Sequence, residues 1–268
     1  MRFAFGKNWR SFISVINDVR IAEAERAICA SLAKSDLSGL RALDIGSGSG
    51  LSSLAMRRLG AQVVSFDYDM DSVACTKELR RRFDEDNELW QVLQGSVLDA
   101  DFMASLGQFD IVYAWGVLHH TGSMWPALNL AQERVATGGQ LLIALYNDQG
   151  WISKFWWQIK RLYCSGRLGP ALVTTIFYPL FALYMLAMDV RRWQLPGTYA
   201  KKYIHRRGMS VVHDWRDWLG GFPFEVAKPG DVIARLNKAG FSLERESLTR
   251  GWGCNEFVLA RRRDTHGI

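Results

Sequence analysis

The stretch Arg41–Asp69, RALDIGSGSGLSSLAMRRLGAQVVSFDYD, contains two short apolar runs that each end in an acidic residue. The first run ends at Asp44, and three glycines follow it at alternate positions from 46 to 50. Glycines here allow a sharp turn and bring backbone N–H groups close to a ligand, at the edge of an open α/β sheet where ligands bind. The second run ends at Asp67, whose carboxylate can accept both hydroxyls of a ribose. The pattern predicts a nucleoside-containing cofactor, and a nicotinamide cofactor fits this half of the chain equally well.

The rest of the chain alternates between strand-like and helix-like patterns. Apolar, β-favouring runs predict strands at Ala42–Ile45, Gln62–Phe66, Trp90–Gln94, Phe109–Tyr113 and Gln140–Leu145, with a closing pair at 241–247 and 255–261. Helical spacing predicts helices at Leu51–Leu59, Asp71–Phe83, Trp125–Val135 and Asp231–Lys238. Gly60 and the pair Gly138-Gly139 are expected to end helices. This alternation predicts an α/β fold, a Rossmann-like doubly wound and mostly parallel sheet with crossover helices on both faces.

Four segments are expected along the chain. Residues 1–40 form an N-terminal helical lid, and residues 41–147 form the cofactor-binding core. Residues 148–228 are a helical insertion on the acceptor side. Residues 229–268 supply the last helix and the closing strand pair of the core.

Composition and charge narrow the class of protein. The 268 residues are 49% hydrophobic, which is enough to bury a sizeable core. The four cysteines are scattered without a C-x-x-C pair, which predicts a cytoplasmic protein with reduced thiols, no disulfide framework and no metal. The net charge of +6 is uneven, because residues 151–208 contain ten Lys or Arg against one Asp; this segment carries +9 and the rest −3. A concentrated charge predicts an anionic surface or substrate nearby, whereas a nucleic-acid binder would spread its charge more widely.

Several motifs together resemble the class I S-adenosylmethionine-dependent methyltransferases. LDIGSGSG (43–50) is similar to their first motif, VVSFDYD (63–69) to their second, and QGSVLD (94–99) to the loop after their third strand. FDIVYAWGVLHH (109–120) resembles their fourth-strand block, and its GVLHH variant is common among small-molecule methylases of the ubiquinone-biosynthesis type. The resemblance covers Leu40–Asn147 well and 227–247 more loosely. It implies a seven-stranded sheet with a reversed last strand.

The resemblance also implies a cofactor and the residues that hold it. The cofactor is S-adenosylmethionine, and the product is S-adenosylhomocysteine. Asp67 would bind the ribose, Tyr68 would flank the adenine, and Trp115 would line the sulfonium. Ser96, which stands where the family often has an acid, would border the adenine together with Val97. The methionine end would lie against the first loop, at Asp44, Gly46, Ser47, Gly48 and Gly50.

Four residues are candidates for catalysis on the acceptor side. His119 or His120 could take a proton from a hydroxyl or thiol, an effect typically worth about 10²–10⁴ in rate. The alternative is structural, with an imidazole that packs and hydrogen-bonds a backbone group. Tyr146 and Asn147 follow the fifth predicted strand and would lie over the acceptor, or they form part of a turn.

The apolar run Ala171–Met188 lies within the insertion and is near membrane-spanning length. A span would place two ends of one domain on opposite sides of a membrane, so we do not expect one. Two interpretations stay open. The run forms a buried lid or dimer helix, or it forms an interfacial helix with basic flanks that contacts a membrane surface weakly.

The expected activity is transfer of a methyl group from S-adenosylmethionine to a small or lipophilic acceptor, at oxygen or alternatively at a thiol. A second class stays open, a catalytically silent cofactor-binding regulator. Nucleic-acid methylation is not expected, because WGVLHH (115–120) stands where an N/D-P-P-Y/F segment would be required. The protein is expected in the cytoplasm, free or peripheral to the membrane, as a monomer or a homodimer.

Overall fold

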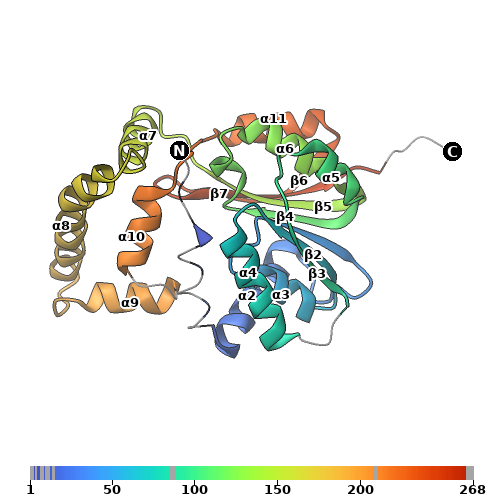
Figure 1. Ribbon diagram of the computed structural model, residues 1–268, viewed down its shortest axis with the longest axis horizontal. Helices are drawn as coiled ribbons and strands as arrows, with labels where there is room; N and C mark the ends of the chain where they lie inside the picture. The colour runs from blue at the N-terminus through green and yellow to red at the C-terminus, as the bar shows by residue number, and fades with distance from the viewer. Residues whose placement is uncertain are drawn as a thin grey trace.

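The computed structural model describes residues 3, 5, 6, 9, 13, 16–84, 88–207 and 211–263, with only the backbone described at 203–207 and 213. Within this part, seven strands form one sheet in the order β3-β2-β1-β4-β5-β7-β6 (Figure 1). The strands are β1 (Arg41–Ile45), β2 (Gln62–Asp67), β3 (Trp90–Gln94), β4 (Phe109–Trp115), β5 (Val135–Tyr146), β6 (Phe241–Ser247) and β7 (Cys254–Arg261). β7 runs antiparallel to both neighbours, and the other pairs are parallel. The predicted fold class and the reversed last strand are confirmed.

Helices cover both faces of this sheet (Figure 1). One layer consists of α2 (Asp18–Leu32), α3 (Leu51–Arg58) and α4 (Met70–Phe83), and it shares a buried cluster with the sheet that includes Ile21, Leu54 and Val73. The other layer consists of α5 (Ala100–Ser105), α6 (Met124–Gln132) and α11 (Pro229–Lys238), which bury Met103 and Leu128. The doubly wound arrangement leaves the carboxyl ends of the parallel strands open for a ligand.

The sequence interpretation of Gly138 and Gly139 as a helix end is wrong, because both lie inside β5. The register between β4 and β5 shifts between Phe109 and Ile111, which marks an irregularity at this point of the ladder. Gly138 has a φ of +78°, and a Cβ on Gly139 would lie 2.8 Å from the carbonyl oxygen of Asp110. The glycines therefore allow a bulge in a long strand, and the preceding helix ends earlier, at Gln132.

The insertion after β5 folds into four helices that stand to one side of the sheet in Figure 1. They are α7 (Trp151–Tyr163), α8 (Leu168–Arg191), α9 (Thr198–Arg207) and α10 (Val211–Gly220). Helices α7, α8 and α10 meet around a separate aromatic cluster that includes Trp156, Trp218 and Phe224. This cluster gives the insertion a core of its own beside the open edge of the sheet.

Two predictions concern the N-terminal segment and the apolar run of the insertion. The predicted boundary at residue 40 between an N-terminal lid and the core stays a prediction. Helix α2 packs on the sheet beside α3. The described residues before Ile16 are the ones that approach the open edge of the sheet. The interpretation of the apolar run as a buried lid is wrong for the single chain, because only 11% of the most apolar window of α8 is buried. Its inner face is packed and its outer face is exposed, as the side-chain burial shows residue by residue.

Candidate functional site

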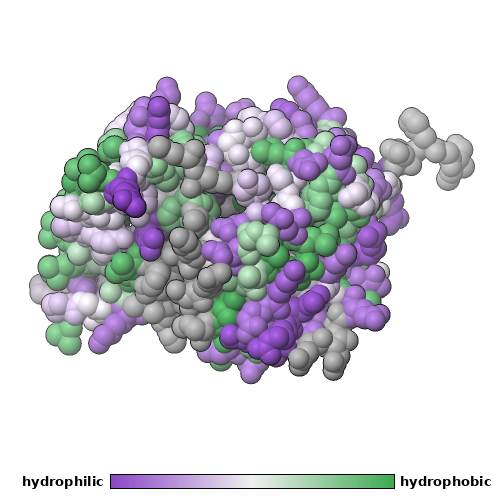
Figure 2. Space-filling view, viewed as in Figure 1, coloured by the Kyte–Doolittle hydropathy of each residue, from purple (hydrophilic) through white to green (hydrophobic). Residues whose placement is uncertain are grey.

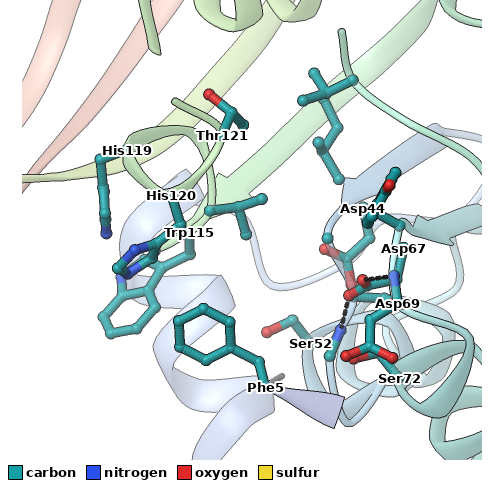
Figure 3. A pocket seen from close by; sticks show the side chains of 18 of the residues that line it. Phe5, Asp44, Ser52, Asp67, Asp69, Ser72, Trp115, His119, His120 and Thr121 are labelled. Carbon is teal, nitrogen blue, oxygen red and sulfur yellow. Dashed lines mark hydrogen bonds between the residues drawn. The ribbon is translucent and has the colours of Figure 1, made fainter. Parts of the chain in front are cut away.

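A cavity of about 940 Å³ lies at the carboxyl edge of the parallel strands. Figure 3 shows Asp44, Asp67 and Asp69 at one end, His119 and His120 at the other, and Phe5 between them. Twelve of the fourteen predicted site residues line this one cavity: Asp44, Gly46, Ser47, Gly48, Asp67, Tyr68, Ser96, Val97, Trp115, His119, His120 and Tyr146. The two that do not are Gly50 and Asn147.

The glycine loop after β1 is folded tightly against the end of β2. The N–H groups of Gly46 and Ser47 both donate to the carbonyl oxygen of Phe66, at 2.8 and 3.1 Å. Gly46 has a φ of +71°, and a Cβ there would lie 2.5 Å from the side chain of Val117. Glycine suits this position, because it adopts the positive φ without strain and a side chain would collide with Val117 in the loop after β4.

Asp67 is fixed by two backbone amides. Its Oδ2 accepts a hydrogen bond from the N–H of Gly48 at 3.0 Å, and its Oδ1 accepts one from Asp69 at 2.9 Å (Figure 3). The two bonds hold the carboxylate between the glycine loop and the start of α4. A carboxylate can accept about four hydrogen bonds, so its position and chemistry suit a ribose diol.

Asp44 is buried beneath the same loop, with a relative exposure of 2%. A chain of hydrogen bonds reaches it through the core: the indole of Trp90 donates to Ser65 Oγ at 2.8 Å, Ser65 donates to Ser53 Oγ at 2.7 Å, and Ser53 donates to Asp44 Oδ2 at 2.5 Å. Burial raises the pKa of Asp44 to about 7, against the opposing effect of the Ser53 hydrogen bond and with a further rise from Asp67. The relay fixes the orientation of a carboxyl group that titrates near neutral pH.

Gly50 was expected to line the cofactor site, but it does not line the cavity and has a packing role instead. It precedes α3 with a φ of +82°, and a Cβ there would lie 2.9 Å from the side chain of Thr76. Its place outside the cavity wall does not support the assignment to cofactor binding, which stays a prediction. The glycine instead lets α3 and α4 approach each other.

The remaining predicted cofactor residues form the outer walls. Tyr68 and Trp115 are 56% and 47% exposed, and the indole of Trp115 donates to Glu256 Oε1 at 3.1 Å. The Ser96 hydroxyl accepts a hydrogen bond from the Leu98 N–H at 3.2 Å, which closes a turn. Val97, buried at 6% exposure, supplies an apolar wall beside it.

Residues near the N-terminus close the cavity from the opposite side. The N–H of Gly6 donates to Asp69 Oδ2 at 3.0 Å. A Cβ on Gly48 would lie 3.0 Å from the indole of Trp9, so the glycine permits a close approach of that ring. Phe5 lies against His120 with ring centroids 4.9 Å apart. The cavity is therefore bounded both by residues near the N-terminus and by residues of the cofactor-binding core.

The two histidines lie side by side in the 3₁₀ turn Leu118–His120, with ring centroids 4.4 Å apart. His120 Nδ1 lies 2.7 Å from the carbonyl oxygen of Pro223; the carbonyl can only accept, so Nδ1 carries the proton and Nε2 carries the lone pair. His119 is 1% exposed, and its Nδ1 is buried without a hydrogen-bond partner. Burial, then the neighbouring His120 and Lys160, hold the pKa of His119 well below its usual value.

Tyr146 and Asn147 lie next to each other at the end of β5, but only Tyr146 lines the cavity. The Tyr146 ring lies 4.1 Å from the His119 ring and 5.7 Å from the ring of Trp218, at the cavity wall. Asn147 lies outside the wall: its Nδ2 donates to the Thr249 carbonyl at 3.1 Å, and its Oδ1 accepts from Asn255 Nδ2 at 3.1 Å. These hydrogen bonds match the turn cluster that was the alternative, and the catalytic assignment of Asn147 stays a prediction.

The sequence interpretation missed several residues of the acceptor end. Trp218 and Trp252 stack with centroids 5.7 Å apart and planes 14° apart, and both line the cavity with Asp217. Trp252 follows the last helix, and no local pattern links it to this site.

Lys160 is a second group that the sequence did not single out. It is fully buried, donates to the carbonyl oxygen of Trp218, and places its Nζ 4.2 Å from the Trp218 ring centroid and 4.9 Å from that of Phe224. Burial lowers its pKa to about 7. Its contacts fix Trp218 at the cavity wall.

The site as a whole fits S-adenosylmethionine. Its volume lies in the range of ligand cavities, its inner end offers backbone amides and two carboxylates, and its outer walls are aromatic and apolar. Glycine at 46 and 48 lets the side chains of Val117 and Trp9 pack closely against the loop at this end. In the part of the chain that the structure describes, no group of three or more metal-ligating side chains is gathered.

A family model described as a methyltransferase domain matches residues 20–225. The chain belongs to this family. The match and the fold confirm the predicted class, an S-adenosylmethionine-dependent methyltransferase. Its cofactor is S-adenosylmethionine, for which the cavity described above has the required groups.

Curated relatives of this methyltransferase include two proteins named ubiquinone biosynthesis O-methyltransferase. One is from Brucella anthropi, 29% identical over 137 residues that cover 49% of this chain and 53% of the relative. The other is from Rhodopseudomonas palustris, also 29% identical over 137 residues, which cover 49% of this chain and 52% of the relative. The chain thus matches about half the length of these relatives.

Solved structures share the fold. Magnesium protoporphyrin IX methyltransferase from Synechocystis PCC 6803, with S-adenosylhomocysteine bound, superposes with a TM-score of 0.54 at 15% identity over 92% of this chain and 88% of that one. PKMT2 from Rickettsia typhi, in complex with the same product, has a TM-score of 0.58 at 11% identity, over 91% and 53% of the two chains. At these identities the likeness concerns the fold alone.

Proposed function

We propose that this methyltransferase transfers the methyl group of S-adenosylmethionine to a hydroxyl of a small lipophilic acceptor. The observation that carries the proposal is that one cavity contains both the Asp67 end and an aromatic end with paired histidines. When bound, the cofactor supplies an electrophilic methyl group on a sulfonium. The names of the curated relatives, O-methyltransferases, favour oxygen over sulfur.

In this proposal the inner end of the cavity binds and orients the cofactor. Asp67, held by the amides of Gly48 and Asp69, accepts the ribose hydroxyls. Asp44, held by Ser53, provides the negative charge toward the cationic methionine end. Tyr68, Ser96 and Val97 border the base, and Trp115 lines the sulfonium region.

In this proposal a residue at the outer end of the cavity accepts the proton of the acceptor hydroxyl. His120 has its tautomer fixed by Pro223, so its Nε2 lone pair can accept a proton from a hydroxyl. His119 is held neutral by burial, which makes it a packing neighbour that keeps the adjacent imidazole in place. The aromatic residues Tyr146, Trp218 and Trp252 keep water from this end and suit a lipophilic acceptor.

An acceptor series tests the proposal. The purified protein is given S-adenosylmethionine and alkylated phenols of graded pKa, with alkyl thiols of matched lipophilicity, and S-adenosylhomocysteine is measured. We expect product with phenols. Turnover by His120→Gln should fall most for the phenols of highest pKa, because acidic phenols ionise without a base. Product with thiols alone, or an equal loss across the phenol series, would contradict the proposal.

A further inference from the structure

The outer face of α8 is a long uncharged surface. Its exposed apolar side chains recur about every four residues, and each is between 44% and 82% exposed: Leu168, Leu172, Ile176, Leu180, Leu183, Tyr184, Leu186 and Val190. At 1.5 Å per residue the 24-residue helix is about 36 Å long. Figure 2 shows hydrophobic side chains gathered at the left edge, where Figure 1 draws α8. A contiguous exposed apolar face of this kind is typical of an interaction site.

The inner face of α8 is already occupied. Phe177 lies 5.5 Å from Trp156, and Tyr178 and Phe181 lie 5.5 and 5.4 Å from Trp215, measured between ring centroids. The one acid of the helix, Asp189, is 1% exposed and accepts hydrogen bonds from the N–H groups of Gly197 and Tyr199. The helix is therefore apolar on both faces, and the chain buries only one of them.

These contacts also decide the orientation of α8. By length and composition it is the one helix, among the residues that the structure describes, that could cross a membrane. Its middle is attached to α10 through Trp215, and its carboxyl end is attached to the start of α9 through Asp189. A crossing helix would have to break these contacts, whereas a helix lying flat on a surface keeps all of them and presents only its outer face.

Charge identifies the partner of that face. In residues 149–213 the only acid is the buried Asp189, while exposed cations lie at both ends of α8, at Arg167, Arg191, Arg192, Lys201 and Lys202. Trp193 is 96% exposed beside them, with a φ of +53°. Basic residues beside an apolar face with an exposed Trp match the interface of an anionic bilayer. A second copy would instead bring two segments of charge +9 together.

We propose that the outer face of α8, with the basic residues at its ends, docks flat onto the surface of an anionic lipid bilayer. The proposal concerns a binding surface and does not depend on which acceptor is methylated. Each exposed cation near an anionic surface strengthens binding about fivefold at low salt. The apolar face adds to this attraction when its leucines enter the acyl boundary.

Vesicle flotation tests the proposal with the whole protein. We expect binding to vesicles of phosphatidylcholine and phosphatidylglycerol at low salt, weaker binding at high salt, and much weaker binding to phosphatidylcholine alone. Leu180→Gln with Leu183→Gln should lower the partition coefficient about 25-fold, roughly fivefold for each half-exposed leucine. The matched control is Val19→Gln, an exposed apolar residue of α2 at 65% exposure, which should bind like the unchanged protein.

Charge reversal gives an independent variant. Arg191→Glu with Lys202→Glu should lower partitioning at low salt by about thirtyfold or more, whereas Arg26→Glu with Lys238→Glu changes the net charge equally and should have little effect. Circular dichroism and cofactor binding verify that each variant is folded. No binding at low salt, or binding that both α8 variants leave unchanged, overturns the proposal. Sedimentation that shows a dimer lost in Leu180→Gln with Leu183→Gln, without vesicle binding, assigns the face to a second copy instead.

Discussion

Replacement of Asp44 by asparagine should raise the free energy of unfolding of the cofactor-free protein, relative to the unchanged protein, by more at pH 8 than at pH 5. The Asp44 side chain is buried at 2% exposure, and that burial raises its pKa from 3.8 to about 7. Between pH 4 and 7 the folded chain holds a proton that the unfolded chain has lost, so stability falls as pH rises through this window. Asparagine has no proton to lose and avoids this decrease.

The magnitude follows from the two pKa values. The unchanged carboxyl costs the folded state about 1.7 kcal/mol at pH 5 and about 4.3 kcal/mol at pH 8, relative to its fully protonated form. The difference, about 2.6 kcal/mol, is the expected change in the stability of Asp44→Asn relative to the unchanged protein between the two pH values. Any fixed cost of placing an amide beside Ser53 is the same at both pH values and cancels.

Urea unfolding followed by tryptophan fluorescence at pH 5 and pH 8 measures this difference. Asp101→Asn, an exposed carboxyl on α5, is the matched control and should show a much smaller change between the two pH values. If the stability of Asp44→Asn relative to the unchanged protein is the same at both pH values within about 0.5 kcal/mol, the carboxyl is ionised throughout and the argument from burial is wrong.

Three further outcomes are expected. Asp67→Ala should weaken S-adenosylhomocysteine binding by about thirtyfold or more in calorimetry, because charge-assisted hydrogen bonds are lost, and an affinity like that of Asp101→Asn would rule out ribose binding. His120→Ala should lower kcat by about 10²–10⁴ with cofactor affinity retained, and parallel losses of both would indicate a packing role. Asn147→Ala should lower the unfolding temperature, since it removes the hydrogen bonds to Thr249 and Asn255, while kcat stays unchanged; a lowered kcat in the folded variant would return Asn147 to the site.

The sheet could be predicted from the sequence because its strands are short apolar runs with clear ends. Strand β2 ends at Asp67 and β1 just after Asp44, where polarity changes abruptly, and both boundaries agree with the structure within a residue. The glycines at 138 and 139 were misassigned because a positive φ serves a helix end and a bulge equally well. Only the pairing of β5 with β4 distinguishes the two, and that pairing is not local in sequence.

The site was predictable where a strand end positions the side chain, and less so elsewhere. Asp67 ends β2 and the histidines lie in the turn after β4, so their place at the open edge follows from topology. Asn147 occupies the same kind of position, yet its amide pairs with residues about a hundred positions away. Trp252 and Lys160 reach the acceptor end through packing of the insertion, and no periodicity or motif in the chain encodes that packing.

A continuous series of rings connects the acceptor end of the cavity with α8. The Tyr146 ring lies 5.7 Å from Trp218, Trp218 lies 5.5 Å from Trp156, and Trp156 lies 5.5 Å from Phe177 on the inner face of the helix. The outer face takes no part in this series, because its leucines contact solvent. Substitutions on the outer face therefore report on surface binding alone, whereas substitutions at Phe177 or Trp156 would disturb the acceptor end as well. This separation within one helix is what allows membrane docking and methyl transfer to be tested independently.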